Sequence, residues 1–264
     1  MNRLRTALPD STAAIGFGVG ILPLGIWYAR RLNDGSDEPL GLIALAAALA
    51  LAWAGREALQ ASDAVRRVAL ILFGLYGLAV WLDLPPLLRA LPALGAVTCW
   101  TGLWKLPGPT ILLGLSLPIL ASLQFYLGYP MRVMAAGLAT GVLNLFTIPV
   151  ERIGTQLLFH ESVLGVDAPC SGIRMLWMTC FFGAVVCGML RLPWLPSLIL
   201  VACAGGVALL ANALRATVLF FPESGMVHWP AWCHEGTGLV MHGLAMAALI
   251  ILARRLEHHH PAQP

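Results

Sequence analysis

"LPWLPSLILVACAGGVALLANAL", residues 192–214, decides the fold because the whole stretch lacks a charged side chain. A helix that spans a bilayer needs about 20 mostly apolar residues. Inside lipid, backbone amides and carbonyls must hydrogen-bond within their own segment, so a spanning segment of this length is an α-helix. The stretch therefore predicts a transmembrane helix.

Similar runs fill the rest of the chain. Of its 264 residues, 59% are hydrophobic and 11% are charged, whereas a soluble domain carries about 25% charged residues. The net charge of +3 is modest, and neither a basic stripe nor a long polar segment predicts a nucleic-acid partner or a separate soluble domain. The sequence thus predicts an all-α fold, a polytopic integral membrane helix bundle with eight or nine transmembrane helices. The other uncharged runs lie at 11–29, 39–55, 68–82, 90–104, 106–131, 133–150, 175–190 and 236–253.

The arginines indicate which ends of the C-terminal helices face the cytoplasm. Lys and Arg accumulate in cytoplasmic loops. Arg191 separates two predicted helices, and Arg254 follows the last one. These ends, together with the polar tail at 254–264, are therefore predicted to be cytoplasmic. The loops at 151–170 and 215–235 then face the extracytoplasmic side of the membrane.

Arg132 separates the uncharged runs 106–131 and 133–150, so the same rule predicts a cytoplasmic turn there. In the N-terminal half the rule gives no answer. In both the eight-span and the nine-span arrangement, some arginines lie on the extracytoplasmic side of the membrane. The side of the membrane on which the N-terminus lies stays open.

Three reactive side chains, those of Cys170, Arg215 and His234, are predicted to meet at the extracytoplasmic face. A thiolate is favoured at a helix N-terminus and beside cations, which makes Cys170 a candidate nucleophile. A histidine can take the thiol proton and later protonate the leaving amine. An arginine can stabilise the oxyanion of a tetrahedral intermediate. The set therefore suits nucleophilic attack by a thiol on a carbonyl group.

Two residues beside the thiol can support this chemistry. Gly172 lacks a side chain and would let a substrate backbone come close. Arg174 lies four residues after Cys170, and therefore on the same face of a helix. It can favour the thiolate, hold a substrate carboxylate, pair with Asp167 or Glu161, or snorkel outward as a membrane anchor.

Each reactive residue alone has a more common structural explanation. A cysteine at a helix edge is usually a packing residue, and an interfacial arginine is usually a snorkelling anchor. A histidine near tryptophans is usually an interfacial residue. The catalytic interpretation depends on all three falling on one face. No metal is predicted, because the histidines lack a paired ligand pattern such as His-Glu-x-x-His, and no cofactor motif is found.

Short motifs surround the three residues. They read "CSGIR" at 170–174, "NALR" at 212–215 and "HEGTG" at 234–238. In their order and spacing they resemble the exosortase/archaeosortase family, whose motifs are a Cys followed by Ser or Ala and Gly, an Asn-x-x-Arg, and a His separated from a Gly by three residues. The resemblance delimits an exosortase-like membrane core at 105–253, whereas the helices of residues 1–104 match only as generic apolar helices.

The resemblance implies a membrane cysteine transpeptidase in the bacterial cytoplasmic (inner) membrane. Such an enzyme cleaves the C-terminal sorting tail of an exported protein, which consists of a short motif, a transmembrane helix and a basic cluster. It then passes the protein to an acceptor at the cell surface, and the resemblance also implies that the enzyme is exopolysaccharide-associated. By resemblance, Cys170 is the nucleophile, Arg215 the electrostatic stabiliser and His234 the base and acid. Asn212 of the second motif joins Gly172 and Arg174 as a supporting residue.

The predicted partners are tailed exported proteins and the lipid bilayer. A polytopic bundle can bind the single helix of such a substrate through small residues. This chain offers small residues at 137–141 and 203–206. The alternative is that both segments serve packing within the chain.

Alternatives for single residues stay open. Cys233 could form a disulfide with Cys170 if their side of the membrane is oxidising, or be a spectator. His228 and His242 are rival bases. His228 lacks the glycine four positions later, and His242 lies two turns beyond His234.

Two alternative functions also stay open. With water as the acceptor, the protein would be a hydrolytic membrane cysteine protease. A transporter or assembly subunit is the non-enzymatic alternative. Transporters often contain inverted repeats, but the halves of this sequence show no repeat and its polar set lies at one edge.

Overall fold

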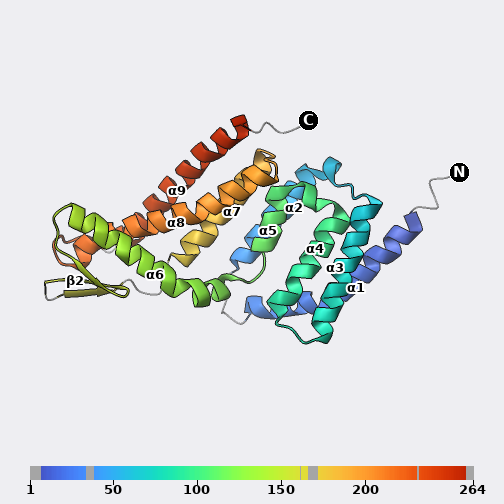
Figure 1. Cartoon of the computed structure of the whole chain (residues 1–264), viewed down its shortest axis with the longest axis horizontal. Helices are drawn as coiled ribbons and strands as arrows, with labels where there is room; N and C mark the ends of the chain where they lie inside the picture. Colours follow the sequence, from blue (N-terminus) through green and yellow to red (C-terminus); the bar gives the residue numbers. More distant parts are fainter. Residues whose placement is uncertain (1–6, 34–38, 161, 166–171, 231, 260–264) are drawn as a thin grey trace. The chain divides into compact units, whose positions relative to one another are not determined.

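The structure, a computed structural model, describes residues 7–33, 39–160, 162–165, 172–230 and 232–259. α-Helices make up most of these residues. The chain divides into two compact units, residues 1–119 and 120–264 (Figure 1).

The first unit is a helical bundle with an aromatic cluster in its core. The ring centroids of Phe17 and Phe73 are 4.3 Å apart, and those of Phe17 and Trp100 are 4.9 Å apart. This cluster joins the first, third and fourth helices. The elements are α1 (Ala7–Asn33), α2 (Leu40–Ala54), α3 (Asp63–Trp81), α4 (Pro86–Thr101) and α5 (Pro107–Leu115), with short 3-10 turns at Arg56–Ala58 and Leu103–Lys105.

The second unit is organised around one long helix, α8 (Trp194–Glu223), which packs against α6, α7 and α9. Ala204, Ala208 and Ala211 are buried along α8, and small side chains of this kind let helices approach closely. The other elements are α6 (Leu120–Leu145), β1 (Glu151–Ile153), β2 (Gln156–Phe159), β3 (Ser162–Gly165), α7 (Ile173–Met189) and α9 (Trp232–His259).

Two helices continue beyond the charges that delimit them in the sequence. α8 runs past Arg215 to Glu223. α9 runs past Arg254, so residues 254–259 of the predicted polar tail are helical, and Arg254 pairs with Glu257 at 3.0 Å. A charged residue ends an uncharged run without ending the helix, because a long side chain can carry its charge to a polar surface.

The predicted turn at Arg132 is wrong. α6 runs without a break from Leu120 to Leu145, and the break lies earlier, around Pro118 between α5 and α6. Proline lacks an amide hydrogen and clashes with the preceding helical turn. Within α6 the Nε of Arg132 donates to the Gly128 carbonyl at 3.4 Å, and its guanidinium lies 6.0 Å from the Tyr129 ring centroid. The arginine is accommodated by its own helix.

The segment predicted as an outer loop contains a three-stranded antiparallel sheet in the order β1-β2-β3. Its inner face is apolar, because Leu157 is buried with Val150 in a cluster that includes Phe220 of α8. Asn144, near the end of α6, fixes the start of the sheet. Its Nδ2 donates to the Val150 carbonyl at 3.1 Å, and its Oδ1 accepts from the Val150 amide at 3.0 Å. The all-α prediction therefore holds for the bundle but omitted this sheet.

The predicted helical membrane fold is confirmed, but the count of eight or nine spans is not. Among the described residues, three helices are long and apolar enough to cross a membrane: α3, α8 and α9. A fourth span results if α5 and α6 form one broken span. α2 and α7 are apolar but shorter.

The two small-residue segments at 137–141 and 203–206 are partly used for internal packing. Ala139 and Ala204 are fully buried. Gly141 and Gly206 have open space where a Cβ would lie. The alanines of these segments thus pack within the chain, whereas the glycines Gly141 and Gly206 do not.

Candidate active site

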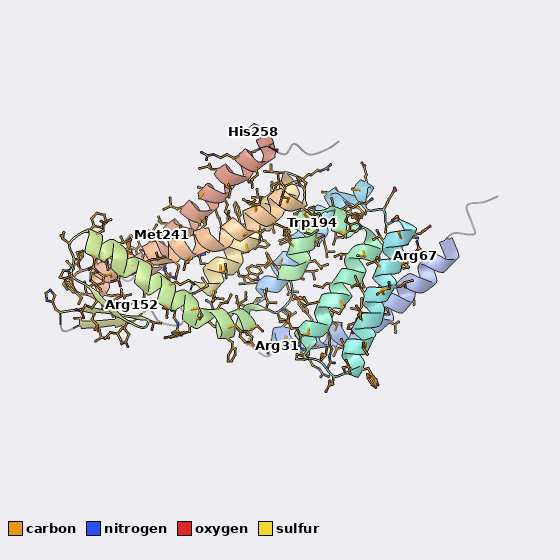
Figure 2. The ribbon with its side chains drawn as sticks, in the orientation of Figure 1. Arg31, Arg67, Arg152, Trp194, Met241 and His258 are labelled. Carbon is orange, nitrogen blue, oxygen red and sulfur yellow. The ribbon has the colours of Figure 1, made fainter. Side chains whose placement is uncertain are left out.

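The predicted site residues gather at one end of the second unit. Figure 2 shows Arg152 of β1 at this end, and Trp194 and His258 at the opposite end, where α8 begins and α9 ends. The sheet packs against the end of α8 through Leu157 and Phe220, and α7 and α9 both pack against α8. Cys170 itself lies outside the described residues, as do Asp167 and Glu161.

The first and second motifs touch through Gly172 and Asn212. Gly172 precedes α7 with a φ of 78°, a conformation that favours glycine. A Cβ at this position would lie 2.8 Å from both Cγ and Nδ2 of Asn212. Asn212 is only 2% exposed. The space beside Gly172 thus holds the Asn212 side chain, although the sequence suggested that a substrate backbone would approach there.

The second and third motifs touch through Arg215 and His234. Nη2 of Arg215 lies 3.3 Å from Nε2 of His234. Arginine can only donate hydrogen bonds, so Nε2 must be the acceptor. Gly238 lies one helical turn after His234, and a Cβ there would be 3.5 Å from Nε of Arg215. The glycine of the third motif therefore leaves room for the guanidinium.

Arg215 has a second hydrogen-bond donor besides the nitrogen that contacts His234. Its Nε is buried and has no hydrogen-bond partner within the described ranges. A buried donor of this kind can bind an oxygen that becomes negatively charged during a reaction. The arginine therefore has a donor for a ligand besides the nitrogen that contacts His234 in this structure.

One further residue near His234 belongs to none of the three motifs. Glu223, the last residue of α8, has its Oε1 4.0 Å from Nδ1 of His234. The two side chains are 43% and 47% exposed. No motif marked this glutamate, and it lies beyond the uncharged stretch at 192–214. Only the continuation of α8 past Arg215 could have indicated it.

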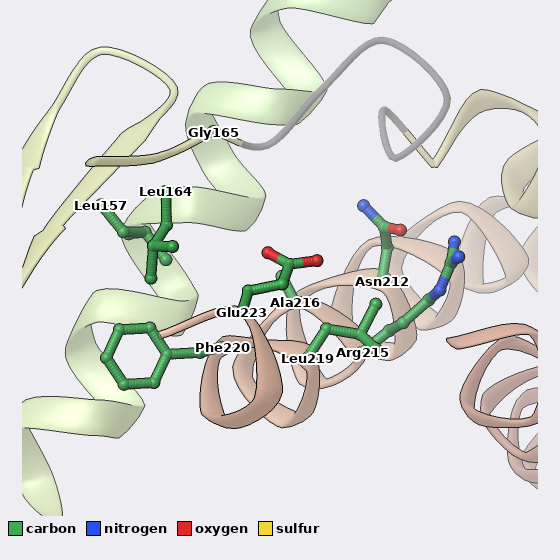
Figure 3. A pocket seen from close by; sticks show the side chains of 9 residues that line it. All are labelled: Leu157, Leu164, Gly165, Asn212, Arg215, Ala216, Leu219, Phe220 and Glu223. Carbon is green, nitrogen blue, oxygen red and sulfur yellow. The ribbon is translucent and has the colours of Figure 1, made fainter. Parts of the chain in front are cut away.

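A shallow pocket that is open to solvent lies beside these residues (Figure 3). Figure 3 shows the carboxylate of Glu223, the amide of Asn212 and the guanidinium of Arg215 at one side of the pocket. The rest of the lining is mainly apolar and comes from the sheet and α8: Leu157, Leu164, Gly165, Ala216, Leu219 and Phe220. The pocket thus combines apolar walls with the polar groups that a reaction at a carbonyl would need.

The three candidate histidines differ in their contacts. His228 is exposed between α8 and α9. His242 has its Nδ1 2.9 Å from the Gly238 carbonyl, which occupies that nitrogen within α9. His234 is the histidine that contacts Arg215.

The remaining predicted residues are placed as follows. Arg174 is exposed in the first turn of α7. Cys233 lies in the first turn of α9, and the alternative of a disulfide to Cys170 stays open because Cys170 lies outside the described residues. Within the described part of the chain, no group of three or more His, Cys, Asp or Glu residues could hold a metal ion.

One family model matches the chain. Its description is transmembrane exosortase (Exosortase_EpsH), and the match covers residues 11–251. The matched range includes the helices before residue 105, for which the motifs alone gave only a generic resemblance. No curated protein and no solved structure matches the chain at a significant level.

Proposed function

Since this chain belongs to the transmembrane exosortase family, we propose that it is a membrane-embedded cysteine transpeptidase. Its substrate is an exported protein with a C-terminal sorting tail, and its product is that protein joined to a cell-surface acceptor. The observation that carries the proposal is the contact of Arg215 with His234, at 3.3 Å, in the same site as Asn212 and Gly172. Residues of three short motifs, far apart in the sequence, thus lie together.

The first step of the proposed reaction acylates the enzyme. His234 accepts the proton of the Cys170 thiol at Nε2, and the sulfur attacks the carbonyl carbon of the scissile peptide bond. Arg215 donates to the resulting oxyanion. When the tetrahedral intermediate collapses, His234 gives its proton to the leaving amine, and a thioester to Cys170 remains.

The second step transfers the acyl group. A nucleophile of the acceptor attacks the thioester, His234 takes the proton of that nucleophile, and the Cys170 thiolate leaves. Substrate binding has to move Arg215, because its Nη2 occupies the nitrogen of His234 that accepts the thiol proton. The carbonyl oxygen of the substrate offers the guanidinium a new acceptor. His234 is thereby released when a substrate is present.

The pocket beside Arg215 suits the part of the substrate next to the scissile bond. Its walls from the sheet and α8 can enclose apolar side chains while the carbonyl faces the arginine. The substrate's own transmembrane helix would lie within the bilayer along the bundle. The catalytic core is proposed to be residues 105–253, preceded by N-terminal helices at 1–104 and followed by a cytoplasmic tail at 254–264.

The proposed location is the bacterial cytoplasmic (inner) membrane, with the site on the extracytoplasmic side. The arginines at 191 and 254 lie at the opposite end of α8 and α9 from the site, and Lys and Arg favour the cytoplasmic side. This orientation places the site where an exported substrate emerges.

The test is processing of a tailed substrate in cells. The substrate is an exported protein from the same genome that ends in a short motif, an apolar helix and a basic cluster. Cys170→Ala, His234→Gln and Arg215→Gln are each expected to leave the substrate uncleaved, while the variant still accumulates in the membrane. Cys233→Ala is the matched control, because it removes a neighbouring thiol and should retain processing. Cleavage by the Cys170→Ala variant would exclude the proposal.

Two outcomes would favour the other functions. A product with a free carboxylate at its new C-terminus, measured by mass spectrometry, would indicate hydrolysis instead of transfer. Normal phenotypes of Cys170→Ser and Arg215→Ala, combined with a defect on deletion of the whole gene, would favour a transporter or assembly subunit.

A further inference from the structure

We infer that Glu223 is a positioning residue for His234. Together with Arg215 it favours the imidazole tautomer that base catalysis requires, and it holds the ring in the orientation for that task. This role rests on the proposed function, because it assigns Glu223 a task only if His234 is the base. The contact itself can be tested without any substrate.

The tautomer follows from the contact with Arg215. Arginine has no acceptor atom, so Nε2 of His234 accepts from Nη2 and carries no proton in the neutral ring. The single proton of the neutral imidazole is therefore on Nδ1. This is the nitrogen that faces Oε1 of Glu223. One side of the ring thus offers a lone pair, and the other side offers a proton to a carboxylate.

The separation of 4.0 Å is that of an ion pair and is longer than a direct hydrogen bond. Both side chains are nearly half exposed, so the attraction contributes little to stability while His234 is neutral. It gains importance when His234 has taken the thiol proton, because the ring is then positively charged and the carboxylate is its counter-charge. A carboxylate behind a catalytic histidine acts in this way in the Ser-His-Asp triad.

The fold fixes Glu223 in this position. It ends α8, and the amide of Ser224 donates to the Phe220 carbonyl at 2.8 Å, while Gly225 adopts a φ of 77° and turns the chain away. Arg215 lies two turns earlier on the same helix. α8 therefore supplies the partners of both ring nitrogens of His234.

A rival role for Glu223 follows from its place in the pocket. Its carboxylate lies at the pocket wall with Arg215 and Asn212, and could bind a cationic group of the substrate. The two roles differ in what a substitution changes. A positioning residue affects the rate of the chemical step, whereas a binding residue affects the substrate concentration at half-maximal rate.

The first test uses the purified full-length protein in bilayers, with its histidines labelled with 15N. The His234 signals are identified by their loss in His234→Gln. We expect a protonated Nδ1 and an unprotonated Nε2, and we expect the Nδ1 signal to move in Glu223→Gln. The matched control is Glu235→Gln, which removes an equal charge next to His234 in sequence and should leave the signal in place. A protonated Nε2, or an Nδ1 signal that is unchanged in Glu223→Gln, would overturn the inference.

The second test compares kinetic constants with a tailed substrate. Glu223→Gln is expected to lower kcat by about tenfold, less than the roughly 10²–10⁴-fold that general acid–base catalysis contributes as a whole, with KM unchanged. Glu235→Gln should change neither constant. A raised KM with an unchanged kcat would assign Glu223 to substrate binding and overturn the positioning role.

Failure of the two proposals can be told apart. If the wild-type protein processes no tailed substrate, the proposed function fails, while the 15N spectra still report on the contact. If Glu223→Gln does not accumulate in membranes, Glu223→Asp replaces it. The shorter carboxylate keeps the charge but draws it away from the ring, so the Nδ1 signal must still move.

Discussion

The side chain of Asn212 fills the space that a Cβ at position 172 would need, since that Cβ would lie 2.8 Å from Cγ and Nδ2 of Asn212. Gly172 is two residues from the proposed nucleophile Cys170, and Asn212 is three residues from Arg215. The contact therefore links the segment that carries the thiol to the helix that carries the cation.

Gly172→Ala is expected to abolish most processing. The new methyl group displaces Asn212, and the φ of 78° adds about 1–2 kcal/mol of backbone strain for a residue with a side chain. The measurement is the rate of substrate cleavage at matched membrane levels. Gly183→Ala on α7 is the control, because a Cβ there makes only ordinary contacts at 3.8 Å and beyond. Wild-type cleavage by Gly172→Ala would contradict the importance of this contact.

Gly238→Ala is expected to lower activity while the helix remains folded. Alanine stabilises a helix interior by about 0.5–1 kcal/mol relative to glycine, but here its methyl group lies 3.5 Å from Nε of Arg215. It would restrict the movement of the guanidinium toward a substrate carbonyl. Cleavage rate and thermal stability are measured together. Gly243→Ala on the same helix, which meets open space, should retain full activity. Equal activities of the two variants would argue against a role for this spacing.

Arg174→Gln is expected to slow the alkylation of Cys170 by iodoacetamide at neutral pH. Arg174 lies in the first turn of α7, and a nearby cation favours the thiolate, which is the reactive form. The thiol is followed by mass spectrometry of the peptide that contains it. Arg191→Gln, at the other end of α7, is the control and should leave the rate unchanged. If Cys170 is alkylated as fast in Arg174→Gln as in the wild type, Arg174 is a membrane anchor.

Asn144→Ala is expected to loosen the sheet from α6. It removes both hydrogen bonds to the backbone of Val150, and an unpaired buried backbone group costs about 1–3 kcal/mol. Limited proteolysis should therefore cut the segment 146–165 faster than in the wild type. Because Leu157 and Leu164 of the sheet line the pocket, cleavage of the tailed substrate should fall as well. Asn144→Asp keeps the acceptor for the Val150 amide. Its rate of proteolysis is therefore expected to lie between the rates of the wild type and of Asn144→Ala. Unchanged proteolysis of Asn144→Ala would show that other contacts hold the sheet.

The positions of most helices could be predicted from the sequence, because long uncharged runs leave the backbone no alternative to a helix in lipid. The ends of the helices could not be predicted in this way. Arg132 and Arg215 interrupt the uncharged runs, yet both lie inside continuous helices. Long arginine side chains reach partners one turn away or beyond, so their charge does not mark the end of a helix.

The sheet could not be predicted from the sequence for a different reason. Its strands are only three or four residues long, too short for a clear alternation of polar and apolar side chains. Their stability comes from Leu157 packing against α8 and from the two hydrogen bonds of Asn144. These contacts join parts of the chain that the local pattern does not connect.

By itself, the sequence determined that this is a helical membrane protein, and its three motifs indicated the family. Such features are local. The hydropathy of a segment depends on its own residues, and each motif lies within a few consecutive positions. Only the tertiary structure decided that Asn212 lies against Gly172, that Arg215 contacts His234, and that Glu223 faces the other side of the same ring. Those relationships depend on how α7, α8 and α9 pack, and packing is fixed by the shapes of many side chains at once.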